Sequence, residues 1–178
     1  MEKYIRKFLK EIFPCVFFTL VTLSVTVHAH AHADNACHHF VLKLPCVVVP
    51  LAPAAQDAEA KQFITPTNGM ARLYMIRDFV SVHEQRMTLL VNGQAVADIA
   101  PFTYAAIDIA AGKYRINALS TNKAEIALDV KAGKLYFLKA NLHLMLNTVS
   151  ANLMMLDEAE GKREVSESDR VIALPFAP

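Results

Sequence analysis

From residue 70 onward, apolar and polar residues alternate along the chain with a period close to two. Residues 113–119 show the pattern well, because Tyr114, Ile116 and Ala118 alternate with polar neighbours. Successive side chains of a strand point to opposite faces of a sheet, so this alternation predicts half-buried strands. Eight segments show it, namely residues 70–79, 86–91, 94–100, 103–109, 113–119, 124–130, 134–141 and 153–156.

Turn-forming residues separate these segments. Asn92-Gly93 is the strongest hairpin signal, because a type I′ turn needs positive φ at both central residues. The segment at 134–141 is apolar on both faces near Phe137, which is typical of a central strand. No helical periodicity separates the predicted strands, and this argues against a parallel α/β sheet.

The pattern therefore predicts an all-β fold, an antiparallel β-sandwich of about seven or eight short strands with a short C-terminal helix. The helix is expected within residues 157–170, where Glu158 and Lys162 are four residues apart and oppositely charged. Gly161 weakens this helix. A domain of this size can bury one core without a metal or a disulfide.

The N-terminus has the three-part form of a secretory signal. Four basic residues precede an uncharged apolar run at 12–27, and alternating His and Ala residues follow it. Small residues at alternate positions predict cleavage after Ala31 or Ala33. The alternative is an uncleaved anchor, in which residues 12–33 hold the protein in the inner membrane. The run is short for a span, which needs about 20 residues.

A second apolar stretch covers residues 40–55. Its three prolines argue against a helix or a central strand. It is either an extended linker or, if translation starts later, the apolar region of the signal itself. No lipid-attachment motif precedes Cys15, Cys37 or Cys46. The predicted organisation is a signal peptide (1–33), an extended Pro/Ala-rich linker (34–68), the β-sandwich domain (69–170) and an extended or frayed tail (171–178).

Several strand and turn motifs occur together in an order that is familiar from a bacterial family. These are ARLYMIR at 71–77, LLVNGQ at 89–94, Tyr104, AGKY at 111–114, AGKLYFL at 132–138 and LDEAEG at 156–161. In this order they resemble the bacterial domain-of-unknown-function family 2846, and they are similar to PEGA-type envelope modules. The resemblance implies an exported or lipid-anchored β-sandwich protein, and it implies no reaction, ligand or functional residue. Many relatives have a lipid-attachment cysteine, which this chain lacks.

The charge distribution gives no sign of a nucleic-acid partner. The net charge is +1, and basic and acidic residues are interleaved, so no basic patch is expected. The chain contains no G-x-S-x-G, G-x-G-x-x-G or Walker motif. Lys113 and Lys134 follow single glycines, which is ordinary turn chemistry. We therefore predict no enzymatic activity, no catalytic residue and no cofactor.

A histidine-rich segment near the signal is the strongest chemical motif. Imidazole and thiolate groups suit zinc, copper or nickel, and here they belong to His28, His30, His32, Cys37, His38 and His39. Cleavage after Ala33 removes three of these histidines. The remaining Cys37, His38 and His39 are adjacent in the sequence and cannot by themselves complete a tetrahedral set of ligands. We therefore assign no metal site, and a periplasmic metal-binding protein that uses this segment remains the alternative function.

Two further histidines and one cysteine pair complete the candidate groups. His83 is expected in a loop and His143 near the end of a strand, and a joint catalytic or metal role for them is the less favoured interpretation. Cys37 and Cys46 could pair in an oxidising compartment. Their disulfide would constrain the segment before the β-sandwich domain rather than the domain itself.

An apolar cluster lies near the C-terminal end of the predicted domain, formed by Leu142, Leu144, Met145, Leu146, Leu153, Met154 and Met155. Buried packing is the favoured interpretation, and an exposed contact patch is the alternative. The predicted function is that of an exported, periplasmic or cell-envelope protein that acts as a non-catalytic binding or structural module. Its expected partner is an envelope protein, a glycan or a lipid, and membrane contact is expected only through an uncleaved signal segment.

Overall fold

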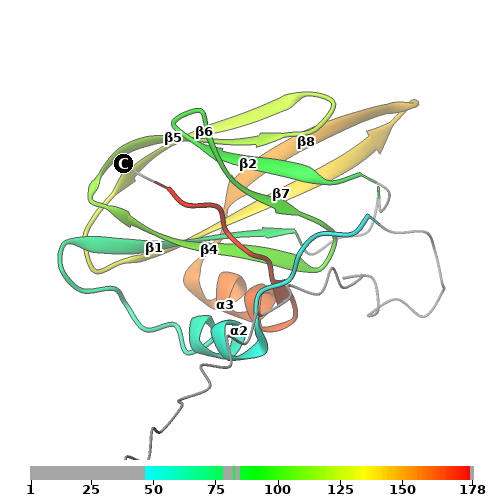
Figure 1. The fold of residues 1–178 in the computed structure, drawn as a ribbon. Helices are drawn as coiled ribbons and strands as arrows, with labels where there is room; N and C mark the ends of the chain where they lie inside the picture. The colour runs from blue at the N-terminus through cyan, green and yellow to red at the C-terminus, as the bar shows by residue number, and fades with distance from the viewer. Residues whose placement is uncertain (1–46, 78–81, 83–84, 177–178) are drawn as a thin grey trace, which may run out of the picture. The chain divides into compact units, whose positions relative to one another are not determined.

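The computed structural model describes residues 47–77, 82 and 85–176. This part of the chain is mostly β-structure, with nine strands in two sheets and two short helices (Figure 1). The helices are α2 (Ala54–Ala60) and α3 (Glu158–Ser166). The strands are β1 (Met70–Arg77), β2 (Met87–Val91), β3 (Gln94–Ile99), β4 (Thr103–Ala110), β5 (Gly112–Leu119), β6 (Lys123–Val130), β7 (Leu135–Met145), β8 (Thr148–Met155) and β9 (Asp169–Arg170).

The strands form a five-stranded sheet of order β8-β7-β1-β4-β9 and a four-stranded sheet of order β3-β2-β5-β6. The prediction of a purely antiparallel fold is wrong, because β1 pairs with β7 in parallel and β4 pairs with β9 in parallel. The connectivity explains the first parallel pair. After β4 the chain crosses to the other sheet for β5 and β6, and it then returns beside β1 in the same direction.

Each predicted strand segment overlaps a strand of the structure. The Asn92-Gly93 hairpin between β2 and β3 is confirmed, with φ of 50° at Asn92 and 84° at Gly93. Three features differ from the prediction. Strand β7 continues to Met145 and β8 begins at Thr148, so this hairpin is longer than expected, and the short strand β9 was not predicted.

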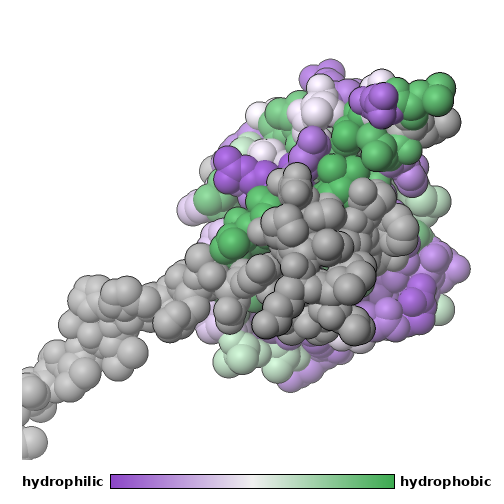
Figure 2. Space-filling view, turned by 90° about the vertical axis from the view of Figure 1, so that its right-hand side faces the viewer, coloured by the Kyte–Doolittle hydropathy of each residue, from purple (hydrophilic) through white to green (hydrophobic). Residues whose placement is uncertain are grey.

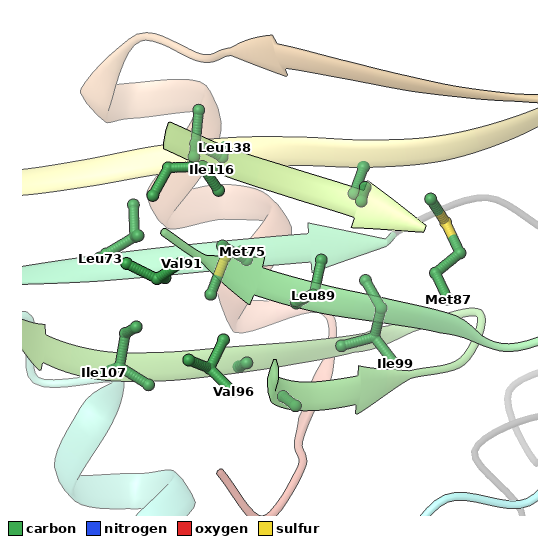
Figure 3. Packing of buried hydrophobic residues seen from close by; sticks show 14 of the residues in the cluster. Leu73, Met75, Met87, Leu89, Val91, Val96, Ile99, Ile107, Ile116 and Leu138 are labelled. Atoms are coloured by element: carbon green, nitrogen blue, oxygen red, sulfur yellow. The ribbon is translucent and has the colours of Figure 1, made fainter. Parts of the chain in front are cut away.

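Side chains from both sheets belong to one buried cluster (Figure 3). Alternate residues of each strand supply it, as the period of two requires. Strand β1 contributes Leu73 and Met75, strand β2 contributes Leu89, and strand β5 contributes Ile116. The core therefore follows the alternation of the strands.

The opposite face of the five-stranded sheet is also apolar, and the two helices pack there. Tyr74 of β1, Tyr104 of β4 and Phe137 of β7 share a second buried cluster with Ala60 of α2 and Val165 of α3. Strands β1, β4 and β7 are therefore apolar on both faces, as expected of central strands.

The segments on either side of the predicted domain pack against it. Val49 and Val171 are buried members of the main core, and Leu51 forms an isolated bridge with Val171. The Ile172 N–H donates to the Pro50 carbonyl at 3.0 Å. The extended linker predicted at 34–68 therefore includes a core-packed segment and helix α2, and the predicted tail begins with a buried residue.

Candidate functional site

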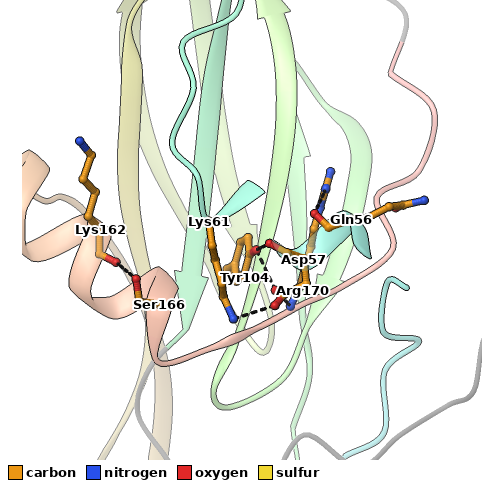
Figure 4. A network of polar contacts seen from close by, with 7 residues as sticks. All are labelled: Gln56, Asp57, Lys61, Tyr104, Lys162, Ser166 and Arg170. Carbon is orange, nitrogen blue, oxygen red and sulfur yellow. Dashed lines mark hydrogen bonds and ion pairs between the residues drawn. The ribbon is translucent and has the colours of Figure 1, made fainter. Parts of the chain in front are cut away.

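A polar cluster joins helix α2 to strands β4 and β9 (Figure 4). The Tyr104 hydroxyl donates to Asp57 Oδ1 at 2.9 Å, and the backbone N–H of Arg170 donates to the same oxygen at 3.1 Å. Lys61 Nζ lies 2.8 Å from the other carboxylate oxygen of Asp57. Arg170 Nη1 donates to the Gln56 carbonyl at 2.8 Å. We call Asp57, Lys61, Tyr104 and Arg170 the α2 clasp.

The residues of the α2 clasp are placed to stabilise the fold rather than to transfer protons. Burial raises the pKa of Tyr104 above its usual value of 10.0, and the hydrogen bond to the Asp57 carboxylate raises it further. The hydroxyl therefore keeps its proton at neutral pH and serves as a donor. The pKa of Tyr104 is higher in the folded protein than in the unfolded chain. The protonated hydroxyl therefore contributes its full stabilisation below pH 10, and this stabilisation is lost as the pH rises further.

Aromatic rings fill the space between the five-stranded sheet and the helices. The Tyr74 and Phe137 rings stack with centroids 5.0 Å apart, and the Tyr74 hydroxyl donates to the Ala60 carbonyl at 2.7 Å. Helix α3 approaches Phe137 closely through Gly161, where a Cβ atom would lie 2.6 Å from Phe137 Cδ1. The glycine that weakens α3 is thus required by the packing of this helix on the sheet.

A shallow pocket of about 400 Å³ lies beside helix α2 and the start of β1. Its charged lining includes Arg72 and Asp108, which are opposite each other in the β1–β4 register. Their side chains form two parallel hydrogen bonds of 2.7 and 2.9 Å, and the hydrogen bond to Asp108 raises the pKa of Arg72. Arg72 is therefore held by an internal carboxylate rather than presented to a ligand.

Two buried charged residues, Arg77 and Glu164, also have internal partners. The Arg77 guanidinium donates to the carbonyls of Gln85 and Val82, and desolvation lowers its pKa to about 10, so the group stays charged at neutral pH. Lys139 of β7 donates to the buried Glu164 carboxylate of α3 at 2.6 Å. The Arg77 bonds tie the segment between β1 and β2 to the end of β1, and the Lys139–Glu164 pair joins β7 to α3.

Of the candidate histidines, His143 is the one that lies among the described residues. The histidine-rich segment, His83 and the Cys37–Cys46 pair all lie outside the described residues. His143 is exposed in β7, opposite Ser150 of β8. Within the described part of the chain, no group of three or more His, Cys, Asp or Glu side chains is placed to hold a metal ion.

Strands β7 and β8 extend past the rest of their sheet as a two-stranded ribbon. Strand β1 pairs with β7 only as far as Lys139, whereas β7 and β8 pair up to Met145 and Thr148. We call residues 140–153 the β7–β8 ribbon. The register shows that, among the described strands of this sheet, residues 140–145 pair only with β8. Figure 1 shows the ribbon ending at the upper right.

The ribbon is braced from the turn between β5 and β6. The Thr121 hydroxyl donates to the Val149 carbonyl at 2.7 Å, and the Ala151 N–H donates to Asn122 Oδ1 at 2.5 Å. A two-stranded hairpin is marginally stable by itself. These two bonds satisfy outward-facing backbone groups of the edge strand β8 and hold the ribbon in place.

The favoured prediction of buried packing for the C-terminal apolar cluster is only partly right. Leu142 is 1% exposed and Leu153 packs partly buried against the core, but Leu144 is 58% and Leu146 is 98% exposed. Met154 and Met155, at the other end of β8, are also exposed. Figure 2 views the domain from the side on which the ribbon ends, and hydrophobic surface gathers in the upper part of this face.

The turn at the end of the ribbon has an unusual residue. Leu146 has φ of 46° and Asn147 has φ of 66°, so both occupy the left-handed region. Asn and Gly adopt this conformation readily, whereas leucine does so at a cost. We call Leu144 and Leu146 the apolar tip. In the sequence, its signal is a stretch at 140–156 with no Asp, Glu, Lys or Arg, interrupted by the turn residue Asn147.

Comparison with known proteins gives a distant relative. The chain is 26% identical over 129 residues to an uncharacterized protein of Haemophilus influenzae, and the match covers 72% of this chain and 77% of that protein. No family model and no solved structure matches the chain. Among the described residues, no helix has the length and apolar character that crossing a membrane requires.

Proposed function

We propose that the chain is an exported protein of the bacterial cell envelope that binds a partner and catalyses no reaction. The N-terminal sequence supports export, because a basic start, an apolar run and alternating small residues are the parts of a secretory signal. The relative of known origin is bacterial, which agrees with a bacterial envelope protein. Membership of family 2846 is part of this proposal and rests on the order of the motifs.

The proposed scaffold is a β-sandwich. It is supported by the buried cluster that residues of both sheets share, and by the side-chain bonds from the β5–β6 turn to β8. The short helix α3 completes the scaffold on the outer face of the five-stranded sheet. Such a scaffold places loops and hairpin ends at its two extremities, where binding residues are commonly found.

A non-catalytic role is supported by the partners of the charged and polar side chains in these clusters. Asp57 is bonded to Tyr104 and Lys61, and Arg72 is bonded to Asp108. Each of these clusters joins two or more elements of the fold. A general acid or base needs a side chain that faces substrate with a suitable pKa, and these clusters direct their polar atoms at one another.

The observation that supports a binding role best is the apolar tip. Leu144 and Leu146 are held in the open at the end of a braced ribbon, within a stretch that has no formal charge. Scattered exposed leucines are common, but here the exposed residues occupy the end of an element that projects from its sheet. The partner in the envelope is a protein, a glycan or a lipid.

Cell fractionation tests the proposal. The protein should be produced from its own N-terminus, and its mass should be measured in the cytoplasmic, periplasmic and membrane fractions. We expect recovery outside the cytoplasm, with a new N-terminus at residue 32 or 34. Recovery in the cytoplasm with Met1 retained or only the initiator removed would contradict export. Turnover of a substrate by the purified protein in a broad hydrolase panel would contradict a non-catalytic role.

A further inference from the structure

The position of Leu146 conflicts with the turn in which it lies. Elsewhere in the described chain, exposed turns with positive φ use Asn or Gly, at residues 68–69, 92–93 and 133. The other apolar residues with positive φ, Phe63 and Phe102, are partly shielded. Leu146 is instead 98% exposed. An exposed leucine in a strained position suggests a role in contact, since Asn or Gly would suit the fold better.

The ribbon places this residue well away from the body of the five-stranded sheet. Six residues of β7, 140–145, follow the last residue that pairs with β1. At about 3.3 Å per residue they reach roughly 20 Å beyond that pairing. Ala140 and Leu142 at the base of the ribbon still pack in the main core, so the exposed part begins after Leu142. The bonds from Thr121 and Asn122 to β8 brace the ribbon. The tip is therefore presented on a supported arm.

The charge pattern of the ribbon indicates the nature of the partner. Residues 140–156 contain no Asp, Glu, Lys or Arg, although 20% of the whole chain is charged. Charged side chains are costly in hydrocarbon, whereas neutral polar groups are accommodated at the level of the lipid headgroups. Asn147 and Thr148, which follow the tip, are neutral polar residues.

The size of the tip argues against a protein partner. A specific protein interface uses about 20–30 residues on each side, and its strongest contacts come mainly from Trp, Tyr and Arg. The apolar tip offers two exposed leucines, and the stretch at 140–156 contains no Trp, Tyr or Arg. A narrow apolar end of this kind suits insertion to about 5–10 Å at the boundary between headgroups and acyl chains.

We propose that the apolar tip, Leu144 and Leu146, inserts into the surface of a lipid bilayer. The inference rests on the proposed envelope-binding role and names its partner. The contact is electrically neutral, so it depends little on anionic lipid or on salt. The tip adds a second attachment if residues 12–33 remain as an anchor, and it is a weak, reversible attachment if they are cleaved.

Site-specific photo-crosslinking tests the proposal in the full chain, because its readout is independent of any other membrane attachment. A diazirine side chain is placed at position 146 and, as a matched control, at position 64. Ile64 is 61% exposed and precedes the start of β1, whereas the ribbon continues past the end of that strand. Cells, and purified protein with neutral phosphatidylcholine vesicles, are irradiated, and the adducts are identified by mass spectrometry.

We expect phospholipid adducts at position 146 in both settings and few at position 64. A protein adduct at 146, without lipid, would overturn the lipid inference and leave the envelope-binding role standing. If position 146 forms no more adducts than position 64, the apolar tip is not a contact site, and both the lipid inference and the binding role assigned to the tip are wrong. This design separates the failure of the inference from the failure of the proposed function.

Substitution gives a second readout at a neighbouring position. With the diazirine at position 144, Leu146→Asn should lower the yield of lipid adducts roughly tenfold, because it removes most of the exposed apolar surface of the tip. Ile64→Asn should leave the yield unchanged, and phosphatidylglycerol in the vesicles should change it little. An unchanged yield in Leu146→Asn, or a yield that requires phosphatidylglycerol, would refute insertion of the apolar tip.

Discussion

Gly161 packs directly against the ring of Phe137, so the structure leaves no room for a methyl group at this position. A Cβ atom there would lie 2.6 Å from Phe137 Cδ1, and Cγ and Cβ of the same residue would be nearer still. Phe137 cannot readily yield, because it is 2% exposed and stacked on Tyr74. Tyr74 is in turn bonded to the Ala60 carbonyl. Gly161→Ala should therefore push α3 away from the sheet.

The expected magnitude follows from two opposing effects. In an unobstructed helix, alanine is more favourable than glycine by about 1 kcal/mol. Overpacking of a filled core commonly costs about 1–3 kcal/mol, and contacts this short belong at the upper end. We therefore expect Gly161→Ala to lower the free energy of unfolding by about 1–2 kcal/mol, where an exposed helix position would raise it.

Urea denaturation followed by circular dichroism measures this difference. Gly112→Ala is the matched control, because a Cβ atom at 112 would meet Tyr114 at an ordinary contact distance of 3.5 Å. It should leave stability nearly unchanged or raise it by a few tenths of a kcal/mol. If Gly161→Ala proves as stable as the unmodified protein, or more stable, α3 does not pack on Phe137 as described.

Three further predictions concern the α2 clasp and the ribbon. Thermal unfolding across pH 8–11 should show a loss of stability above about pH 10, because Tyr104 ionises there in the unfolded chain while the folded protein keeps its hydroxyl protonated, and Tyr104→Phe should make this loss less steep. Leu146→Asn should raise the free energy of unfolding by about 1 kcal/mol, because Asn tolerates positive φ; an unchanged or lower value in urea melts would contradict the strain. Asn122→Ala should speed hydrogen exchange at Ala151, measured by mass spectrometry, while exchange in β1 stays constant.

The sequence predicts the local elements of this fold well, for physical reasons. Alternation reports which side chains share a face, so the pattern alone assigns Tyr114, Ile116 and Ala118 to the core, where they lie. Asn92-Gly93 specifies its hairpin because few other residue pairs adopt positive φ twice. The two apolar faces of the strand around Phe137 correctly predict a central position in a sheet.

The long-range features are less accessible to sequence reasoning. The parallel pairing of β1 with β7 depends on how the chain returns from the other sheet, and no local pattern encodes that return. Val49 lies in a proline-rich stretch that is typical of a linker, yet it packs in the core together with Val171. A two-residue strand such as β9 is too short to show a period.

The apolar tip shows a different limit. Leu142 and Leu144 occupy equivalent positions of the same alternating pattern, but one is buried and the other is exposed. Both residues lie beyond the last residue of β7 that pairs with β1, but only Leu142 still packs in the core that the two sheets share. How far a strand extends past the layer that covers it is not visible in a local pattern. The absence of charge over residues 140–156 is the one signal in the sequence, and it fits a buried hairpin equally well.

Hydrogen exchange with and without isolated envelope membranes tests most directly whether the end of the β7–β8 ribbon is the contact surface. The full chain is exchanged in both conditions, and peptides that cover residues 144–148 are compared with peptides from β1 and α2. The account predicts that membranes slow exchange at 144–148 and leave α2 unchanged. Equal exchange at 144–148 in both conditions, or slowing only at another surface, would contradict it.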